Sequence, residues 1–216
     1  MKLILAALFF ITAGLYASVG FGGGSTYTAL LILMGTPHFI VPIVSLSCNI
    51  LVVTGNSFRY AKQKLIVWPK LWPLLMTSVP AAWMGGRLHI SETVFIGLLW
   101  VALAVAGLRL LFFKALPECR NAEPSHKVWL LGVIGAAIGF YAGLVGIGGG
   151  IFLAPILYAM RWGSSRQIAA ACSLFILLNS LSGIAAHISK LAGMDSLTDA
   201  LAYWPVIPSV LIGGYI

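Results

Sequence analysis

Residues 20–24 read Gly-Phe-Gly-Gly-Gly and residues 146–150 read Gly-Ile-Gly-Gly-Gly, so one glycine cluster occurs twice. Each cluster lies inside a long apolar stretch. Glycine costs about 1 kcal/mol relative to alanine inside a helix, so three in a row predict a helix end. Glycine breaks at matching places in two halves of a membrane protein are the best sequence pointer to the binding site of a carrier.

The sequence around the two clusters is also duplicated. One offset aligns the clusters, and an offset two residues longer pairs Ser45-Leu46 with Ser173-Leu174, Gly55 with Gly183, Lys62 with Lys190, Pro80 with Pro208, and Gly85-Gly86 with Gly213-Gly214. Such self-similarity predicts a repeat architecture. We expect a first repeat at residues 1–113, a polar linker at 114–127 and a second repeat at 128–216.

The second repeat ends at its glycine pair, so the last apolar segment of the first repeat, residues 93–113, has no counterpart. A truncated fragment and a natural copy without its last helix both fit, and we favour the fragment.

Residues 1–20 resemble a secretory signal peptide with a lysine at its start. Because the matching segment 128–146 is internal and cannot be a signal peptide, we expect the first segment to be retained.

The composition predicts an integral membrane protein. The chain is 60% hydrophobic and 8% charged, with a mean hydropathy of +1.01, whereas soluble domains have about 25% charged residues. The net charge of +8 comes from cations scattered at segment ends, as in the cytoplasmic loops of membrane proteins, which argues against nucleic acid as a partner. The expected fold class is all-α, a polytopic transmembrane helical bundle with internal duplication and glycine-broken helices.

The sequence leaves the topology of the two long apolar segments, 3–34 and 128–160, open. Each is longer than the roughly 20 residues of one crossing, so each is one broken helix or two helices folded back as a hairpin. A single crossing places on the cation-poor face Arg87, Arg161 and Arg166; a hairpin places there Lys2, Arg87 and Lys190. Both satisfy the positive-inside rule. We favour the hairpin, which makes the halves inverted repeats.

Acidic residues are absent from the apolar segments and lie only in linkers or at segment ends, namely Glu92, Glu118, Glu123, Asp195 and Asp199. An intramembrane carboxylate is the usual proton relay or cation ligand. A site without one favours anions or neutral solutes, and the free N–H groups at a broken helix end suit an anion.

The candidate substrate-binding residues come from the glycine clusters and from polar positions after them. They are Gly22, Gly23, Gly24, Ser25, Thr26, Ser45, Asn49, Gly148, Gly149, Gly150, Ser173 and Asn179. Glycines let the backbone approach a solute closely, and hydroxyls and amides can hydrogen-bond an oxyanion. The alternatives are close helix packing for the glycines and interhelical hydrogen bonds for the hydroxyls.

No residue pattern indicates catalysis, a cofactor or a metal. The three cysteines, Cys48, Cys119 and Cys172, lack the spacing of a zinc site or a disulfide framework. Residues 143–148 only loosely suggest a dinucleotide-binding loop, because no strand precedes them and no acidic residue follows at the expected distance.

Two stretches carry a family resemblance. AGLVGIGGGIFLAPILYAM at residues 142–160, followed by AAACSLFILLNSLSGIAAH at 169–187, resembles the second-half signature of the TauE/SafE sulfite exporter family. ASVGFGGGSTYTALLILMGTPH at residues 17–38 resembles its first-half signature. The family belongs to the 4-toluenesulfonate uptake permease group. The missing last span and Ser45-Leu46, where the family often has Thr-Ser-Leu, depart from the pattern.

The resemblance implies a multi-pass carrier of the bacterial inner membrane that transports small sulfur-containing anions such as sulfite or organosulfonates. We therefore expect a secondary transporter whose partners are a small anionic solute and membrane lipid; a homo-oligomer is left open. Two other classes fit less well. They are a non-transporting scaffold or assembly protein, whose glycines serve packing only, and a membrane enzyme.

Overall fold

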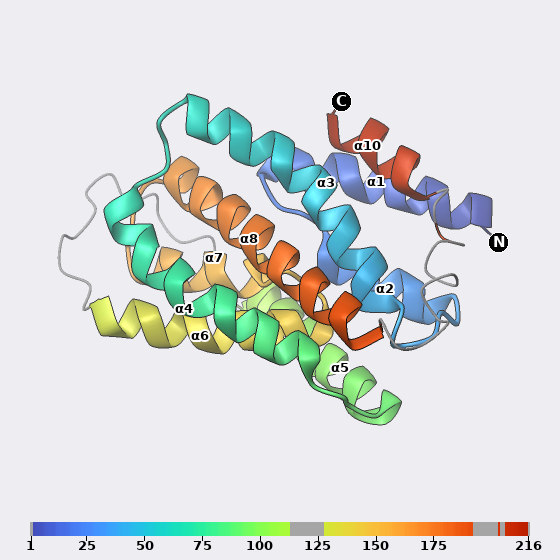
Figure 1. The fold of residues 1–216 in the computed structure, drawn as a ribbon. Helices are drawn as coiled ribbons and strands as arrows, with labels where there is room; N and C mark the ends of the chain where they lie inside the picture. Colours follow the sequence, from blue (N-terminus) through green and yellow to red (C-terminus); the bar gives the residue numbers. More distant parts are fainter. Residues whose placement is uncertain (1, 113–127, 192–202, 204–205, 216) are drawn as a thin grey trace.

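The computed structural model describes residues 2–112, 128–191, 203 and 206–215. These residues form helices and no strand, which confirms the all-α fold class (Figure 1). The helices are α1 (Lys2–Val19), α2 (Gly24–Leu33), α3 (Val41–Lys62), α4 (Trp68–Arg87), α5 (Glu92–Phe112), α6 (Val128–Val145), α7 (Gly150–Ala159), α8 (Ser165–Leu191) and α10 (Val206–Tyr215). The expected linker at 114–127 lies outside the described residues.

Glycines end both α1 and α6. Gly20 has φ +87° and Gly146 has φ +77°, a left-handed conformation that glycine adopts without steric cost. The N–H of Phe21 then donates to the carbonyl of Tyr16 at 2.9 Å, which is the hydrogen bond of a Schellman helix cap. Residues 21–23 are not helical, and α2 begins at Gly24.

Both broken segments fold back as hairpins rather than crossing once. In the first, the ring of Tyr27 stacks on Phe9 with centroids 4.7 Å apart, so α2 runs back along α1. In the second, the rings of Tyr141 and Phe152 meet edge to face at 5.6 Å. Each hairpin therefore returns its chain toward the side from which it entered.

The two halves pack with exchanged partners, which means that helices of each half pack against helices of the other half. Helices α3 and α8 cross antiparallel, since Ser57 contacts Ser173 near one end and Gly183 lies against Leu46 near the other (Figure 1). Helix α4 packs on α6 of the other half, and α10 packs on α1. Inverted repeats require this exchange, although the duplication itself stays a prediction.

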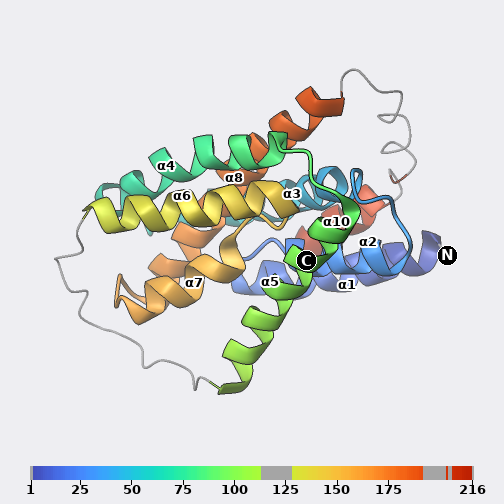
Figure 2. The same ribbon diagram turned by 90° about the horizontal axis from the view of Figure 1, so that it is seen from below.

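The outer surface is that of a multi-pass membrane protein. Helices α3 and α6, and α8 over Ser165–Lys190, are long and apolar enough to cross a membrane by length and composition. Large hydrophobic side chains face outward, among them Leu15 at 65% exposure and Trp100 at 69%. Leu15 lies on α1, and Trp100 lies on α5, which stands away from the rest of the bundle in Figure 2.

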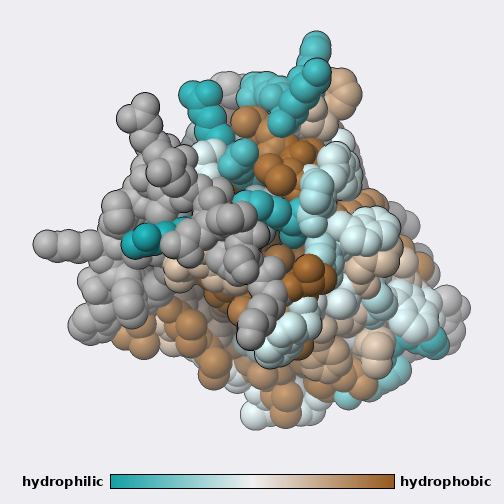
Figure 3. All heavy atoms as spheres, turned by 90° about the vertical axis from the view of Figure 1, so that its left-hand side faces the viewer, coloured by the Kyte–Doolittle hydropathy of each residue, from teal (hydrophilic) through white to brown (hydrophobic). Residues whose placement is uncertain are grey.

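Most of the described cations lie at one end of the bundle. Lys70, in the first turn of α4, donates to the carbonyl of Trp162 at 3.1 Å, which ties the α3–α4 turn to the α7–α8 turn. That end holds Arg59, Lys62, Lys64, Lys70, Arg161 and Arg166. Figure 3 views this end and shows hydrophilic side chains gathered beside hydrophobic ones. Lys2, Arg87 and Lys190 lie at the opposite end (Figure 1).

Candidate functional site

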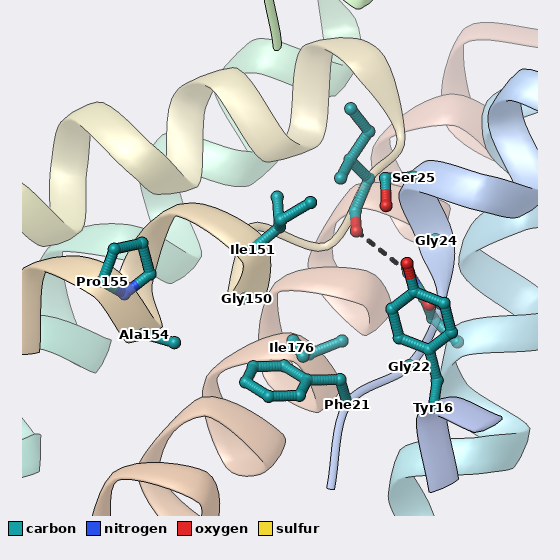
Figure 4. Close-up of a pocket in the computed structure, with 13 residues that line it drawn as sticks. Tyr16, Phe21, Gly22, Gly24, Ser25, Gly150, Ile151, Ala154, Pro155 and Ile176 are labelled. Carbon is teal, nitrogen blue, oxygen red and sulfur yellow. Dashed lines mark hydrogen bonds between the residues drawn. The ribbon is translucent and has the colours of Figure 1, made fainter. Parts of the chain in front are cut away.

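A cavity of about 230 Å³ lies where the two glycine breaks meet. Asn49, near the middle of α3, and Ile176, near the middle of α8, both line it. Figure 4 shows Tyr16 and Ser25 of the first half on one side, and Gly150, Ile151, Ala154 and Pro155 of the second half on the other, with the ring of Phe21 beside Ile176 between them. The cavity therefore lies between the halves, at mid-height on the two central helices.

Two helices, α2 and α7, begin at this cavity. Their N-cap residues, Gly23 and Gly149, have φ +79° and φ +81° and provide no side-chain cap. The first N–H groups of a helix have no partner within the helix. In the described part of the chain, no hydrogen bond reaches the backbone N–H groups of Gly24, Ser25 or Gly150, and all three residues are buried. Unpaired donors from both halves therefore surround the cavity.

Asn49 joins the two breaks. Its Nδ2 donates to the carbonyl of Ile147 at 3.2 Å, and its Oδ1 is buried with no partner among the described residues. A Cβ on Gly22 would lie 2.4 Å from Asn49 Oδ1, and one on Gly24 would lie 2.3 Å from Nδ2. These positions therefore need glycine, because any larger side chain would collide with the amide.

The electrostatic field at the cavity comes from the backbone. None of its lining residues is acidic or basic. The positive ends of α2 and α7 supply the field, each equivalent to roughly +0.5 elementary charge at a helix N-terminus. Glu92, the one acidic residue in the described part of the chain, lies at the start of α5 and contacts His38 at 3.8 Å.

Metal binding has no support in the described residues, where no group of three or more His, Cys, Asp or Glu side chains comes together. The polar groups of the lining residues are backbone N–H and C=O groups, the amide of Asn49 and the hydroxyls of Ser25 and Tyr16. The N–H groups and the hydroxyls can donate hydrogen bonds to a solute.

Half of the sequence-predicted site residues line the cavity, namely Gly22, Gly23, Gly24, Ser25, Asn49 and Gly150. Two more lie directly behind it. A Cβ on Gly148 would lie 2.8 Å from Asn49 Nδ2 and 3.2 Å from Ser180 Oγ, and Gly149 packs against Phe175. The two glycine clusters thus lie at one cavity, and their role in binding a solute stays a prediction.

The other predicted residues do not line the cavity, because helix packing uses their polar groups. Ser45 donates to the carbonyl of Gly24 at 3.0 Å. The remaining three bond elsewhere: Thr26 to Tyr16 at 3.0 Å, Ser173 to Ser57 at 2.9 Å, and Asn179 to Ser78 at 3.1 Å. The interhelical alternative holds for these four residues.

Apolar and aromatic residues complete the cavity, and the sequence did not single them out. They are Tyr16, Phe21, Ile147, Ile151, Ala154, Pro155 and Ile176. Phe21 and Ile147 are the non-glycine members of the two clusters. Their position inside the clusters is therefore the feature of the sequence that could have identified them as cavity residues. The others resemble ordinary membrane-helix residues in a sequence that is 60% hydrophobic.

Comparison with known proteins gives the family. The family described as Sulfite exporter TauE/SafE matches residues 5–216. A probable membrane transporter protein of Sinorhizobium fredii, y4hK, is 32% identical over 217 residues, which cover 98% of this chain and 85% of the relative. The probable membrane transporter protein YjnA of Bacillus subtilis is 26% identical, covering 100% of this chain and 89% of the relative. No solved structure matches. This chain is a membrane transporter that belongs to the TauE/SafE sulfite exporter family.

Proposed function

We propose that the protein is a secondary transporter for small anions of the sulfite or organosulfonate type, and that the cavity between the glycine breaks is its binding site. The observation that carries the proposal is the meeting of two uncapped helix N-termini, at Gly24 and Gly150, at one cavity. Helix N-termini bind sulfate, phosphate and carboxylate groups through their free N–H groups and dipole.

The size of the cavity supports a small solute. Its volume of about 230 Å³ is below the roughly 300–1,000 Å³ of sites that hold drug-sized ligands. The apolar side chains of Ile151, Ala154 and Ile176 exclude water on one side, which strengthens the attraction of the N–H groups for an anion. A sulfonate with a short organic group presents the matching combination of a charged head and an apolar tail.

Two glycines at the breaks, Gly22 and Gly150, differ from the glycines that pack helix against helix, which argues against a scaffold role. On α6, a Cβ at Gly139 or Gly143 would lie 2.4 Å or 2.0 Å from a backbone oxygen of α4. These glycines allow two helices to touch. At the breaks, Gly22 and Gly150 face the side chains of Asn49 and Ile176 and border a cavity.

The exchanged packing of the halves suits alternating access, in which one repeat rocks against the other around a fixed site. The cation-rich end, which includes Lys64 and Arg161, lies in the cytoplasm by the positive-inside rule. A solute would therefore pass between the end that carries Lys2 and the cation-rich end by way of the central cavity.

The test is transport by the purified full chain in proteoliposomes. Sulfite and short organosulfonates are supplied on one side, with an organic cation as the matched non-substrate, and uptake is followed over time. We expect the anions, and not the cation, to move, and to raise the thermal unfolding temperature of the protein. If no such anion moves or stabilises the protein, the anion assignment is wrong, although the protein remains a transporter by family.

A further inference from the structure

A second cavity, of about 250 Å³, lies at the cation-rich end. Its lining comes from both halves: Val19, Phe21 and Tyr60 of the first, and Tyr158, Ser165, Arg166, Ile168 and Ala169 of the second. Arg166, in the first turn of α8, is exposed. This cavity, which we term the vestibule, therefore has a positive charge at the end where most of the described cations lie.

Among the described residues, Phe21 alone lines both the vestibule and the central cavity. Its side chain is half-buried and packs against an apolar cluster built from α4, α6, α7 and α8. A Cβ on Gly150 would lie 3.4 Å from Phe21 Cδ1, so the ring lies beside the N-terminus of α7 (Figure 4).

From this placement we propose that Phe21 is the gate between the central site and the vestibule, and that solute reaches the cation-rich face by rotation of its ring. The gate rests on the proposed function only in taking the central cavity as the solute site. The backbone at Phe21 is fixed by its hydrogen bond to Tyr16 at 2.9 Å. Opening therefore needs only a side-chain rotamer change, which is fast compared with a rocking motion of the halves.

The matching residue of the second half, Ile147, is placed differently. It also lines the central cavity, but it is 4% exposed and belongs to the apolar core with Leu144 and Val145. The two members of the repeat therefore differ in accessibility. In this conformation one aromatic ring, that of Phe21, separates the central cavity from the vestibule. At Ile147, the central cavity is instead bordered by packed apolar core.

The test is accessibility of a cysteine at Ser25, which lines the central cavity but not the vestibule. The background is Cys119→Ser, with Cys48 and Cys172 kept because both are fully buried. A membrane-impermeant anionic thiol reagent is added from the cation-rich face of oriented vesicles. A second labelling position, Ser165→Cys in the vestibule, reports access that does not depend on the gate.

Labelling at Ser25→Cys should be slow with Phe21 and faster by at least about tenfold with Phe21→Ala, if the open rotamer is a minor state of at most about 10%. Phe21→Leu should be intermediate and Phe21→Trp slower than the parent. Ile147→Ala, at the matching position of the second half, should speed labelling much less than Phe21→Ala, and labelling at Ser165→Cys should be the same in all variants.

Labelling does not require transport, so the two proposals can fail separately. If Phe21→Ala, Phe21→Leu and Phe21→Trp all fold and label Ser25→Cys at the parent rate, the gate is wrong even where anions bind. If Ile147→Ala speeds labelling as much as Phe21→Ala, the vestibule is not the route. If labelling follows ring size while no anion binds, the gate stands and the anion assignment fails.

Discussion

The effect of Asn49 on solute binding can be separated from its effect on folding, because α3 carries a second buried asparagine, Asn56, as a control. The Nδ2 atoms of both Asn49 and Asn56 donate to backbone carbonyls at 3.2 Å: Asn49 to Ile147 in the second break, and Asn56 to Ala17 near the end of α1. Both asparagines are buried, at 0% and 5% exposure. Only Asn49 lines the central cavity.

Replacing either asparagine with alanine should destabilise the protein. Both variants lose a hydrogen bond, which is worth about 0.6 kcal/mol on average in a membrane protein. Asn49→Ala also leaves the Ile147 carbonyl without a partner among the described residues, and an unsatisfied buried group costs about 1–3 kcal/mol, whereas the Ala17 carbonyl keeps the N–H of Gly20 at 3.2 Å. We expect stability to fall by about 1–3 kcal/mol in Asn49→Ala and by about 0.6 kcal/mol in Asn56→Ala, measured by thermal or denaturant unfolding in detergent or lipid nanodiscs.

The two variants should differ in solute binding. A solute at 100 times its Kd stabilises the folded state by about 2.7 kcal/mol, so binding can be read from the same unfolding curves. Asn49→Ala removes the contact between the two breaks, and we expect its affinity to fall by at least about tenfold, or 1.4 kcal/mol. Asn56→Ala should keep the parent affinity. Equal loss of affinity in both variants would refute the reasoning, because the effect would then follow stability rather than the site.

The remaining predictions concern residues outside the cavity. Gly143→Ala should destabilise by at least about 1–3 kcal/mol, because its Cβ would lie 2.0 Å from the carbonyl oxygen of Ala82. Gly97→Ala, in α5 with open space around it, should instead be neutral or stabilise by up to about 1 kcal/mol; thermal unfolding measures both. Ser173→Ala should cost about 1 kcal/mol through its bonds to Ser57 and the Val53 carbonyl, and leave anion affinity unchanged in a binding titration.

The sequence predicts the helix breaks well because their cause is local. Gly20 and Gly146 end helices through a left-handed backbone conformation that favours glycine wherever it occurs. The sequence favours a hairpin after each break but does not decide between a hairpin and a single crossing, because the cations satisfy the positive-inside rule in either topology. The deciding contacts, such as Tyr27 on Phe9, are tertiary and leave no pattern in an apolar sequence.

The candidate site was predicted in part for the same reason. Asn49 and the glycines stand out in a chain with 8% charged residues. Ser45 and Ser173 stand out equally, but a buried hydroxyl serves a solute or a neighbouring helix depending on which face of its helix is packed. Tyr16 carries no such signal, because each described helix of this bundle has at least one aromatic residue.

The two helix N-termini at the cavity give a physical reason for coupling solute binding to motion of the halves. Helix α2 belongs to the first half and α7 to the second, and both direct a positive end at the same space. With the cavity empty, these ends repel each other, and in a medium of low dielectric the repulsion is weakly screened. An anion between them is attracted by both ends, each attraction being worth about 0.3–2 kcal/mol. On the proposed function, loading therefore draws the halves together, and release lets them separate. A neutral solute of the same size would lack this effect, so it should bind without stabilising the closed arrangement.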